Sequence, residues 1–277
     1  MSLTVFLLVL MAAALHAGWN AIVKGAADKT ASAVAICVAA ALIAAGLLPF
    51  VAQPARESWP FIAGSVALQT VYYMLVAAAY RRTDMSQAYP VMRGGAPMIV
   101  AVLSGLMFAE VLPPLGWVGV ALISGGIASL AALGRGGSRQ GLAFAALNAC
   151  VIATYTICDG FGVRRSGAPV GYTLWIFLMT APPVLIWAYW QRGAVLAGQI
   201  AARWRDGVIG GLGTMISYGV ALWAMTLAPV AMVAALRETS ILFATLISAL
   251  ILRERVGPGR VAAVGVIACG AAVLRLA

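Results

Sequence analysis

Two segments of the chain align with each other without a gap: YRRTDMSQAYPVMRGGAPMIVAVLSGLMFAEVLPPLGWVGVALISGGIASL (residues 80–130) and AMTLAPVAMVAALRETSILFATLISALILRERVGPGRVAAVGVIACGAAVL (residues 224–274). The alignment places Arg93 on Arg237, and both arginines lie in chain that is otherwise apolar. An internal repeat in a polytopic membrane protein is typical of secondary transporters, whose substrate site lies between the two halves near the bilayer midplane. The repeated arginine is therefore the first candidate for function.

The composition is that of an integral membrane protein. Of 277 residues, 63% are hydrophobic and 9% are charged, and the mean hydropathy is +1.00. A soluble domain normally carries about 25% charged residues. A helix needs about 20 apolar residues to cross the hydrocarbon core, and uncharged stretches of this kind predict ten membrane-spanning helices. The predicted spans are Leu3–Val23, Ala31–Val51, Trp59–Tyr80, Met85–Ala109, Leu112–Leu133, Gly141–Cys158, Val170–Trp190, Val208–Leu227, Val230–Leu252 and Val261–Leu274.

The predicted spans divide into two halves of five. A connection at residues 134–140, rich in Gly and Ser, separates residues 1–133 from residues 141–277, and this composition is typical of flexible linkers. Because five is odd, the second half must enter the membrane from the opposite side, which makes the halves inverted repeats. The predicted fold class is an all-α membrane protein with ten transmembrane helices, arranged as two inverted five-helix repeats around a central cavity.

The same observations argue against several classes of function. The net charge of +10 would suggest nucleic acid in a soluble protein, but the basic residues are scattered over short loops, so we expect no nucleic-acid binding. The four cysteines fall within predicted spans and have the character of packing residues. No motif indicates an enzyme, a cofactor or a metal site, while a channel or a structural membrane protein stays open. The expected partners are the lipid bilayer and a small-molecule substrate. We expect a monomer, because ten spans can close a cavity alone.

Arg93 and Arg237 lie well inside their predicted spans. A charge at the centre of a membrane helix costs about 2.5–3.5 kcal/mol, so it normally faces the bundle interior or water. Three interpretations stay open for these arginines. They tie helix ends together or pair with Glu238 or Asp159, they bind a substrate carboxylate, for which a guanidinium has the matching geometry, or they extend to the headgroups.

Other polar and aromatic side chains recur at helical spacing in the predicted spans. His16, the only histidine, shares a helical face with Trp19 and Asn20, and it is either a satisfied hydrogen bonder or a group that binds substrate or a proton. Inward-facing aromatic and amide groups would line a roomy cavity of mixed polarity. The candidate substrate-binding residues are His16, Trp19, Asn20, Tyr73, Tyr89, Arg93, Asn148, Tyr155, Trp175, Tyr218 and Arg237.

The ends of the two repeats carry a family resemblance. Residues 108–126 and 252–270 each show an acidic residue, a short loop and a Gly-rich final helix. In this pattern, and over the whole chain, the sequence resembles the drug/metabolite transporter superfamily in its ten-helix EamA-type branch. The acidic pair, Glu110 and Glu254, is interpreted as two loop corners without a role in chemistry. Four-helix relatives in the superfamily carry a glutamate eight residues before a lysine in their first helix, whereas this chain has His16 before Lys24.

The resemblance implies a secondary transporter in the bacterial inner membrane. Within this branch, the sequence is most similar in kind to exporters of neutral and aromatic amino acids, which work by alternating access. The missing carboxylate of the first helix leaves both uniport and proton-linked transport open, and it makes export of hydrophobic cations less favoured. A multidrug or other metabolite exporter is the alternative. Pro97 and residues 207–213 are candidate bending points for the movement.

The orientation in the membrane is not settled by the basic residues. Twelve Lys and Arg lie in loops on the side of the connection between the first two spans, against Arg56, Arg164, Arg165 and Arg275 on the other side. The positive-inside rule then places both termini outside. Families with this architecture usually have their termini in the cytoplasm, so the two indications disagree.

Overall fold

The computed structural model describes the chain except for residues 27, 109, 134–137, 251–252 and 254–255. Its secondary structure is helical, and ten helical segments are long and apolar enough to cross a membrane. The helices are α1 (Leu3–Gly25), α2 (Lys29–Leu47), α3 (Trp59–Tyr80), α4 (Met85–Phe108), α5 (Pro114–Leu133), α6 (Arg139–Ser166), α7 (Pro169–Arg192), α8 (Val195–Ala201), α9 (Trp204–Met225), α10 (Val230–Arg237), α11 (Ser240–Leu250) and α12 (Pro258–Leu276), with short 3-10 turns η1 (Leu48–Phe50) and η2 (Arg56–Ser58) between α2 and α3.

The observed spans agree with the predicted ones to within a few residues except in two cases. The sixth was predicted to end at Cys158 but continues to Ser166, and the ninth is made of two helices. α10 ends at Arg237 and α11 begins at Ser240. At the break, the Thr239 hydroxyl donates a 2.6 Å hydrogen bond to the Leu236 carbonyl oxygen. Hydroxyl side chains of this kind compete with the helical backbone hydrogen bonds. The break leaves Arg237 and Glu238 at the inner end of a half-length helix.

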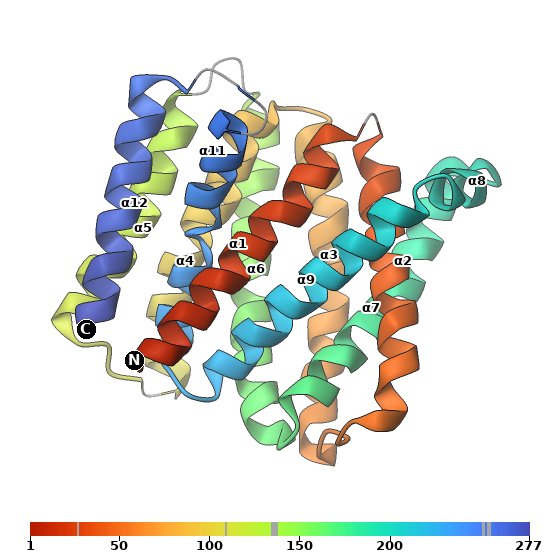
Figure 1. Cartoon of the computed structure of the whole chain (residues 1–277), viewed down its shortest axis with the longest axis horizontal. Coiled ribbons are helices and arrows are strands. Elements are labelled where there is room, and N and C mark those ends of the chain that lie inside the picture. Colours follow the sequence, from red (N-terminus) through yellow and green to blue (C-terminus); the bar gives the residue numbers. More distant parts are fainter. Residues whose placement is uncertain (27, 109, 134–137, 251–252, 254–255) are drawn as a thin grey trace.

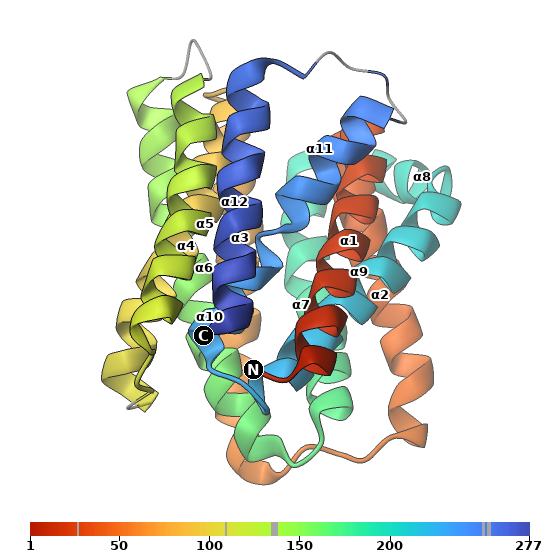
Figure 2. The same cartoon turned by 60° about the vertical axis from the view of Figure 1, so that its left-hand side comes forward.

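The helices stand side by side, and both termini lie at the same end of the bundle (Figures 1 and 2). α5 and α12 pack against each other along one side, and α8 projects from the opposite side. The contacts between helices occur in matching pairs: α3 packs on α6 as α1 packs on α9, and α4 packs on α6 as α1 packs on α11. Such pairs are what two related five-helix halves would produce. The proposed linker falls partly on residues 134–137, outside the described residues.

The contact between α5 and α12 depends on glycines. A Cβ atom on Gly126 would lie 2.8 Å from Ile267 Cγ1, and one on Gly270 would lie 3.0 Å from the Gly119 carbonyl oxygen. Small residues at such positions let two helices approach closely in lipid, where van der Waals contact drives helix association. These two helices therefore form a tightly packed element, and none of their residues lines the pocket described below.

The helices run without a break through the predicted bending points in this structure. α4 continues through Pro97, and α9 continues through Gly207–Gly213. A Cβ on Gly211 would lie 2.9 Å from the Ala40 amide nitrogen of α2. These glycines therefore serve close packing in the conformation seen here, and bending at either place stays a prediction.

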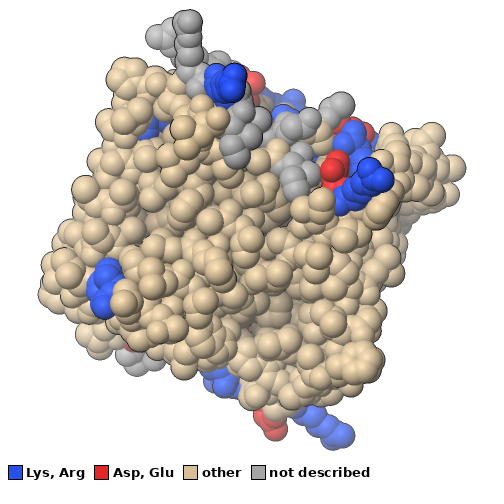
Figure 3. Space-filling model, in the orientation of Figure 1, with Lys and Arg blue, Asp and Glu red and all other residues tan. Residues whose placement is uncertain are grey.

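Charged side chains gather at the two ends of the bundle. Figure 3 shows blue and red atoms mainly along the upper and lower edges of one face, with a broad uncharged surface between them. Large apolar side chains are exposed on several helices, among them Leu42, Leu106 and Ile209. An exposed apolar band between charged rims is what a lipid bilayer requires.

Candidate functional site

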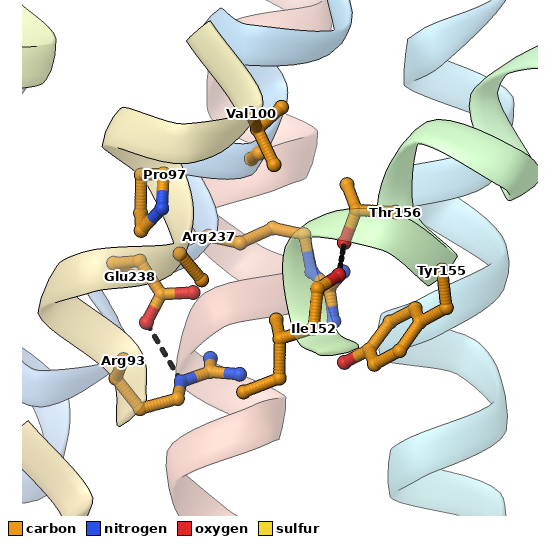
Figure 4. A pocket seen from close by; sticks show the side chains of 10 residues that line it. Arg93, Pro97, Val100, Ile152, Tyr155, Thr156, Arg237 and Glu238 are labelled. Atoms are coloured by element: carbon orange, nitrogen blue, oxygen red, sulfur yellow. Dashed lines mark hydrogen bonds and ion pairs between the residues drawn. The ribbon is translucent and has the colours of Figure 1, made fainter. Parts of the chain in front are cut away.

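A small pocket lies between α4, α6 and α10, where charged groups meet inside the bundle. Figure 4 shows its lining side chains, with Arg93 and Glu238 on one side and Tyr155 and Thr156 on the other. The cavity has a volume of about 10 Å³, which is room for about one water molecule. The sequence predicted a roomy cavity, and the structure instead fills this space with charged side chains.

Arg93 and Glu238 form a buried ion pair. Arg93 Nε lies 2.7 Å from Glu238 Oε2, and the two side chains are 7% and 6% exposed. The Arg93 Nη2 atom is buried and has no hydrogen-bond partner among the described residues. The first interpretation of the arginines, pairing with Glu238, is therefore what the structure shows for Arg93. One of its donors is still unused.

Arg237 is held differently. Its guanidinium carbon lies 4.9 Å from the ring centroid of Tyr218, a distance at which a cation is attracted to an aromatic face. Among the described residues, no carboxylate lies within ion-pair distance of Arg237. Figure 4 shows that its side chain extends from α10 toward α6. Arg237 is thus a half-buried guanidinium at the pocket that forms no ion pair with any described residue.

Asp159 lies one turn along α6 from the pocket residue Thr156. It is completely buried. Tyr172 donates a 3.1 Å hydrogen bond to Asp159 Oδ1, and Tyr218 donates one to Oδ2. Tyr218 therefore connects two charged groups, because its hydroxyl bonds to Asp159 while its ring lies under Arg237.

Aromatic rings surround the charged groups. Tyr89 lies one turn before Arg93 on α4, and the guanidinium carbon of Arg93 is 6.0 Å from the centroid of the Tyr89 ring. Tyr155 lines the pocket and packs edge-to-face with Tyr72 at 6.1 Å between ring centroids. Such rings supply apolar walls with a polar hydroxyl at one end.

Several predicted site residues come together here, and others do not. Tyr89, Arg93, Tyr155, Tyr218 and Arg237 form one cluster with Glu238. Tyr73 lies instead beside Cys37, in a separate apolar cluster between α2 and α7. Trp175 packs on Trp59 and donates a 2.9 Å hydrogen bond to Gln53 Oε1, near the ends of the helices.

The three predicted residues of α1 form a local group. Trp19 Nε1 donates a 3.3 Å hydrogen bond to His16 Nδ1, and the Asn20 side chain donates one of 2.8 Å to the His16 carbonyl oxygen. His16 is close enough to Arg93 and Arg237 for their charges to act on it. His16 is therefore a neighbour of the pocket without lining it.

Asn148 lies on α6, two turns before Tyr155. It is completely buried, and its Nδ2 atom donates to Met92 Sδ at 3.0 Å. Its Oδ1 atom has no hydrogen-bond partner among the described residues. Asn148 is not part of the pocket lining.

Tyr72, Thr156, Glu238 and Asp159 belong to the site or its border but are absent from the predicted set. For the two carboxylates a signal was present, because ionisable residues within membrane segments are rare and usually functional. Tyr72 and Thr156 gave no such signal in the sequence.

Two ion pairs at opposite ends of the bundle connect the halves. Glu110, after α4, pairs with Arg164 of α6 at 2.6 Å and also accepts a 3.0 Å hydrogen bond from the Val230 amide, which begins α10. Arg164 donates to the Met225 and Ala228 carbonyl oxygens. Glu110 thus lies in the loop after α4, as the sequence predicted, but it also contacts α6 and the start of α10. Glu254 lies outside the described residues, as does the side chain of Lys24.

The second pair joins Asp28, the N-cap of α2, to Arg192 at the end of α7. Arg192 Nη2 donates a 3.0 Å hydrogen bond to Asp28 Oδ1, and Arg192 Nη1 donates one of the same length to Gln199 of α8. The hydrogen bond from Arg192 lowers the pKa of the Asp28 carboxyl below its ordinary value. This pair lies at the end of the bundle opposite to Glu110.

The fold and the pocket thus define a membrane protein with ten candidate membrane spans and a charged site in its interior. The model of the EamA-like transporter family matches residues 139–276, the second half of the chain. A solved crystal structure of another protein has the same fold, with a TM-score of 0.77 and 19% sequence identity over 99% of this chain and 98% of that one. No curated protein matches the sequence.

The second half of the chain therefore matches the EamA-like transporter family. This match supports a membrane transporter and not an enzyme.

Proposed function

We propose that this transporter exports neutral and aromatic amino acids, or closely related small metabolites, across the bacterial inner membrane by alternating access. The observation that carries the proposal is Arg237, a guanidinium at the pocket that has no ion pair within the described part of the chain, beside the buried pair of Arg93 and Glu238. A zwitterionic amino acid has one group for each partner. Its carboxylate matches a guanidinium in bidentate geometry, and its ammonium group matches the Glu238 carboxylate.

The pair of Arg93 and Glu238 is replaced by substrate contacts in this mechanism. With room for only one water, the pocket must widen before an amino acid enters. As it widens, the substrate ammonium takes the place of Arg93 at Glu238, and the substrate carboxylate bonds to Arg237. Glu238 keeps a cationic partner and Arg237 gains an anionic one, which offsets part of the cost of releasing Arg93 from the buried pair. Tyr89, Tyr155 and Tyr218 contact the substrate side chain.

Alternation comes from one half of the bundle moving against the other. The matching helix contacts and the opposite starting ends of the two halves support inverted repeats. The ion pairs at the two ends are suited to close the two sides in turn. The same pocket weighs against a multidrug exporter of hydrophobic cations, because two guanidinium groups repel a cationic substrate.

Substitution of Arg237 tests the proposal. Arg237→Gln should raise the KM for L-phenylalanine about 10- to 100-fold in proteoliposome counterflow, because a hydrogen bond to a charged group contributes about 1.5–3 kcal/mol. The KM of Arg237→Lys should lie between those of the wild type and Arg237→Gln, since lysine keeps the charge and loses the bidentate geometry.

Arg260→Gln is the matched control, because Arg260 lies at the start of α12, away from the pocket. Unchanged KM in Arg237→Gln would refute the carboxylate contact. Inhibition of wild-type counterflow by dicationic dyes, without inhibition by amino acids, would favour the multidrug alternative.

A further inference from the structure

Asp159 is a buried carboxylate that the transport mechanism above does not use. It is completely buried, and none of the described Lys and Arg side chains lies within ion-pair distance of it. Ionisable residues inside membrane helices are costly, and they commonly mark proton or ion pathways. The position of this one, a turn from the pocket, requires an explanation.

The groups around Asp159 can satisfy it with or without a proton. From the neighbouring helices it is faced by Ser65 of α3, Tyr172 of α7, Tyr218 of α9 and Arg237 of α10. The titratable groups near it on its own helix are Tyr155 and Cys158. A hydroxyl both donates and accepts hydrogen bonds. The hydroxyl partners can therefore donate to the carboxylate, and one of them can turn to accept from the carboxylic acid.

Tyr218 gives this carboxylate a physical connection to the substrate site. Its hydroxyl bonds to Asp159, and its ring lies 4.9 Å from the guanidinium carbon of Arg237. When Asp159 is charged, its negative charge and the polarised ring both attract Arg237 away from the pocket. When Asp159 holds a proton, that attraction is lost and Arg237 is free to bind an anion.

We propose that Asp159 is a proton-binding site linked through Tyr218 to Arg237, so that a substrate carboxylate and a proton bind together. The inference rests on the proposed function, and it selects proton-linked transport over uniport. Because binding linkage is reciprocal, a carboxylate on Arg237 increases the proton affinity of Asp159, and a proton on Asp159 increases the affinity for the carboxylate. The proton leaves with the substrate during export, so the outward gradient of the substrate drives the movement of both the substrate and the proton. The KM for substrate rises as the pH rises through the titration of Asp159.

The proton site is tested first without any substrate. Infrared difference spectra of the purified protein between acid and alkaline buffer should contain a carboxylic-acid band that is absent in Asp159→Asn. The band should persist in Glu57→Gln, whose native carboxyl is exposed. Tyr218→Phe keeps the ring under Arg237 and removes the hydroxyl, so it should shift the band. If Asp159→Asn removes no band, or if Tyr218→Phe leaves the band unchanged, the proposal is wrong.

The linkage is tested in proteoliposomes with L-phenylalanine as the probe. An acidic exterior should drive several-fold accumulation by the wild type, and a protonophore should abolish it. Asp159→Asn should keep counterflow and lose the accumulation. Accumulation retained in Asp159→Asn overturns the linkage, as does wild-type counterflow without any accumulation. Absence of wild-type counterflow refutes the proposed function instead, and the infrared band then decides on the proton site alone.

Discussion

At the scale of single residues, the pair of Arg93 and Glu238 is the most sensitive part of the site. Both side chains are buried, so removing one partner leaves an uncompensated charge at a cost of about 3–5 kcal/mol. We predict that Glu238→Gln strongly lowers the melting temperature of the purified protein. The double variant Arg93→Gln/Glu238→Gln should recover much of the loss, because it buries no unpaired charge. Thermal unfolding in detergent measures this cycle, and additive losses would contradict it.

The sequence located the charges of the site better than its aromatic walls. Arg93 and Arg237 stand out because each is a charge in an apolar span, and Glu238 was one of two carboxylates expected to pair with them. The sequence could not show which of Tyr72 and Tyr73 faces the site. These neighbours point about 100° apart on a helix, and α3 is apolar nearly all round, so no polar face fixes its rotation. Packing places Tyr72 beside Tyr155 and Tyr73 beside Cys37.

At the scale of helices, glycines determine how closely α5 and α12 pack. A Cβ on Gly270 would lie 2.8 Å from Ile123 Cγ1 and 3.0 Å from the Gly119 carbonyl oxygen, whereas one on Gly265 would meet no atom within 4 Å. We predict that Gly270→Ala destabilises the protein by about 1–3 kcal/mol, as overpacking does. Gly265→Ala on the same helix should leave stability unchanged or raise it slightly. Equal melting temperatures of the two variants would contradict this packing.

Most helix boundaries followed from the sequence to within a few residues, because length and hydropathy determine where a chain crosses lipid. The break between α10 and α11, in contrast, could not be predicted from the sequence. Helix kinks usually come from Pro or Gly, and after Pro229 the ninth span contains neither before Leu250. The break instead coincides with Glu238 and Thr239, where an ion pair and a hydroxyl hydrogen bond supply interactions that depend on other helices. Such tertiary partners are not visible in a local pattern.

At the scale of the whole molecule, the pair of Asp28 and Arg192 makes part of the stability depend on pH. The pKa of Asp28 is lowered by Arg192, so the folded state favours the charged carboxylate. The stabilisation is present above the unfolded pKa of about 3.9 and is lost as the pH falls through the lower folded value. We predict that Asp28→Asn lowers the melting temperature at neutral pH, and that the difference from wild type disappears in strongly acidic buffer. A difference that does not change with pH would assign the effect to capping of α2 alone.

From the positions of the two ion pairs between the halves, we predict which side of the bundle opens when each pair is broken. In a background without the four native cysteines, Thr156→Cys places a thiol in the pocket lining. Glu110→Gln removes a charge-assisted contact of about 1.5–3 kcal/mol, which corresponds to a shift in population of about tenfold or more. Labelling of this cysteine by a membrane-impermeant thiol reagent should increase from the face that carries both termini (Figure 2).

Asp28→Asn should increase labelling from the opposite face instead, because the pair with Arg192 lies at the other end of the bundle. Glu57→Gln is the matched control for Glu110→Gln, since Glu57 is an exposed carboxylate in the connection between α2 and α3. Right-side-out and inside-out vesicles separate the two faces and also decide the orientation of the termini. If Glu110→Gln and Asp28→Asn expose the cysteine to the same face, the two ion pairs do not close opposite sides of one substrate pathway.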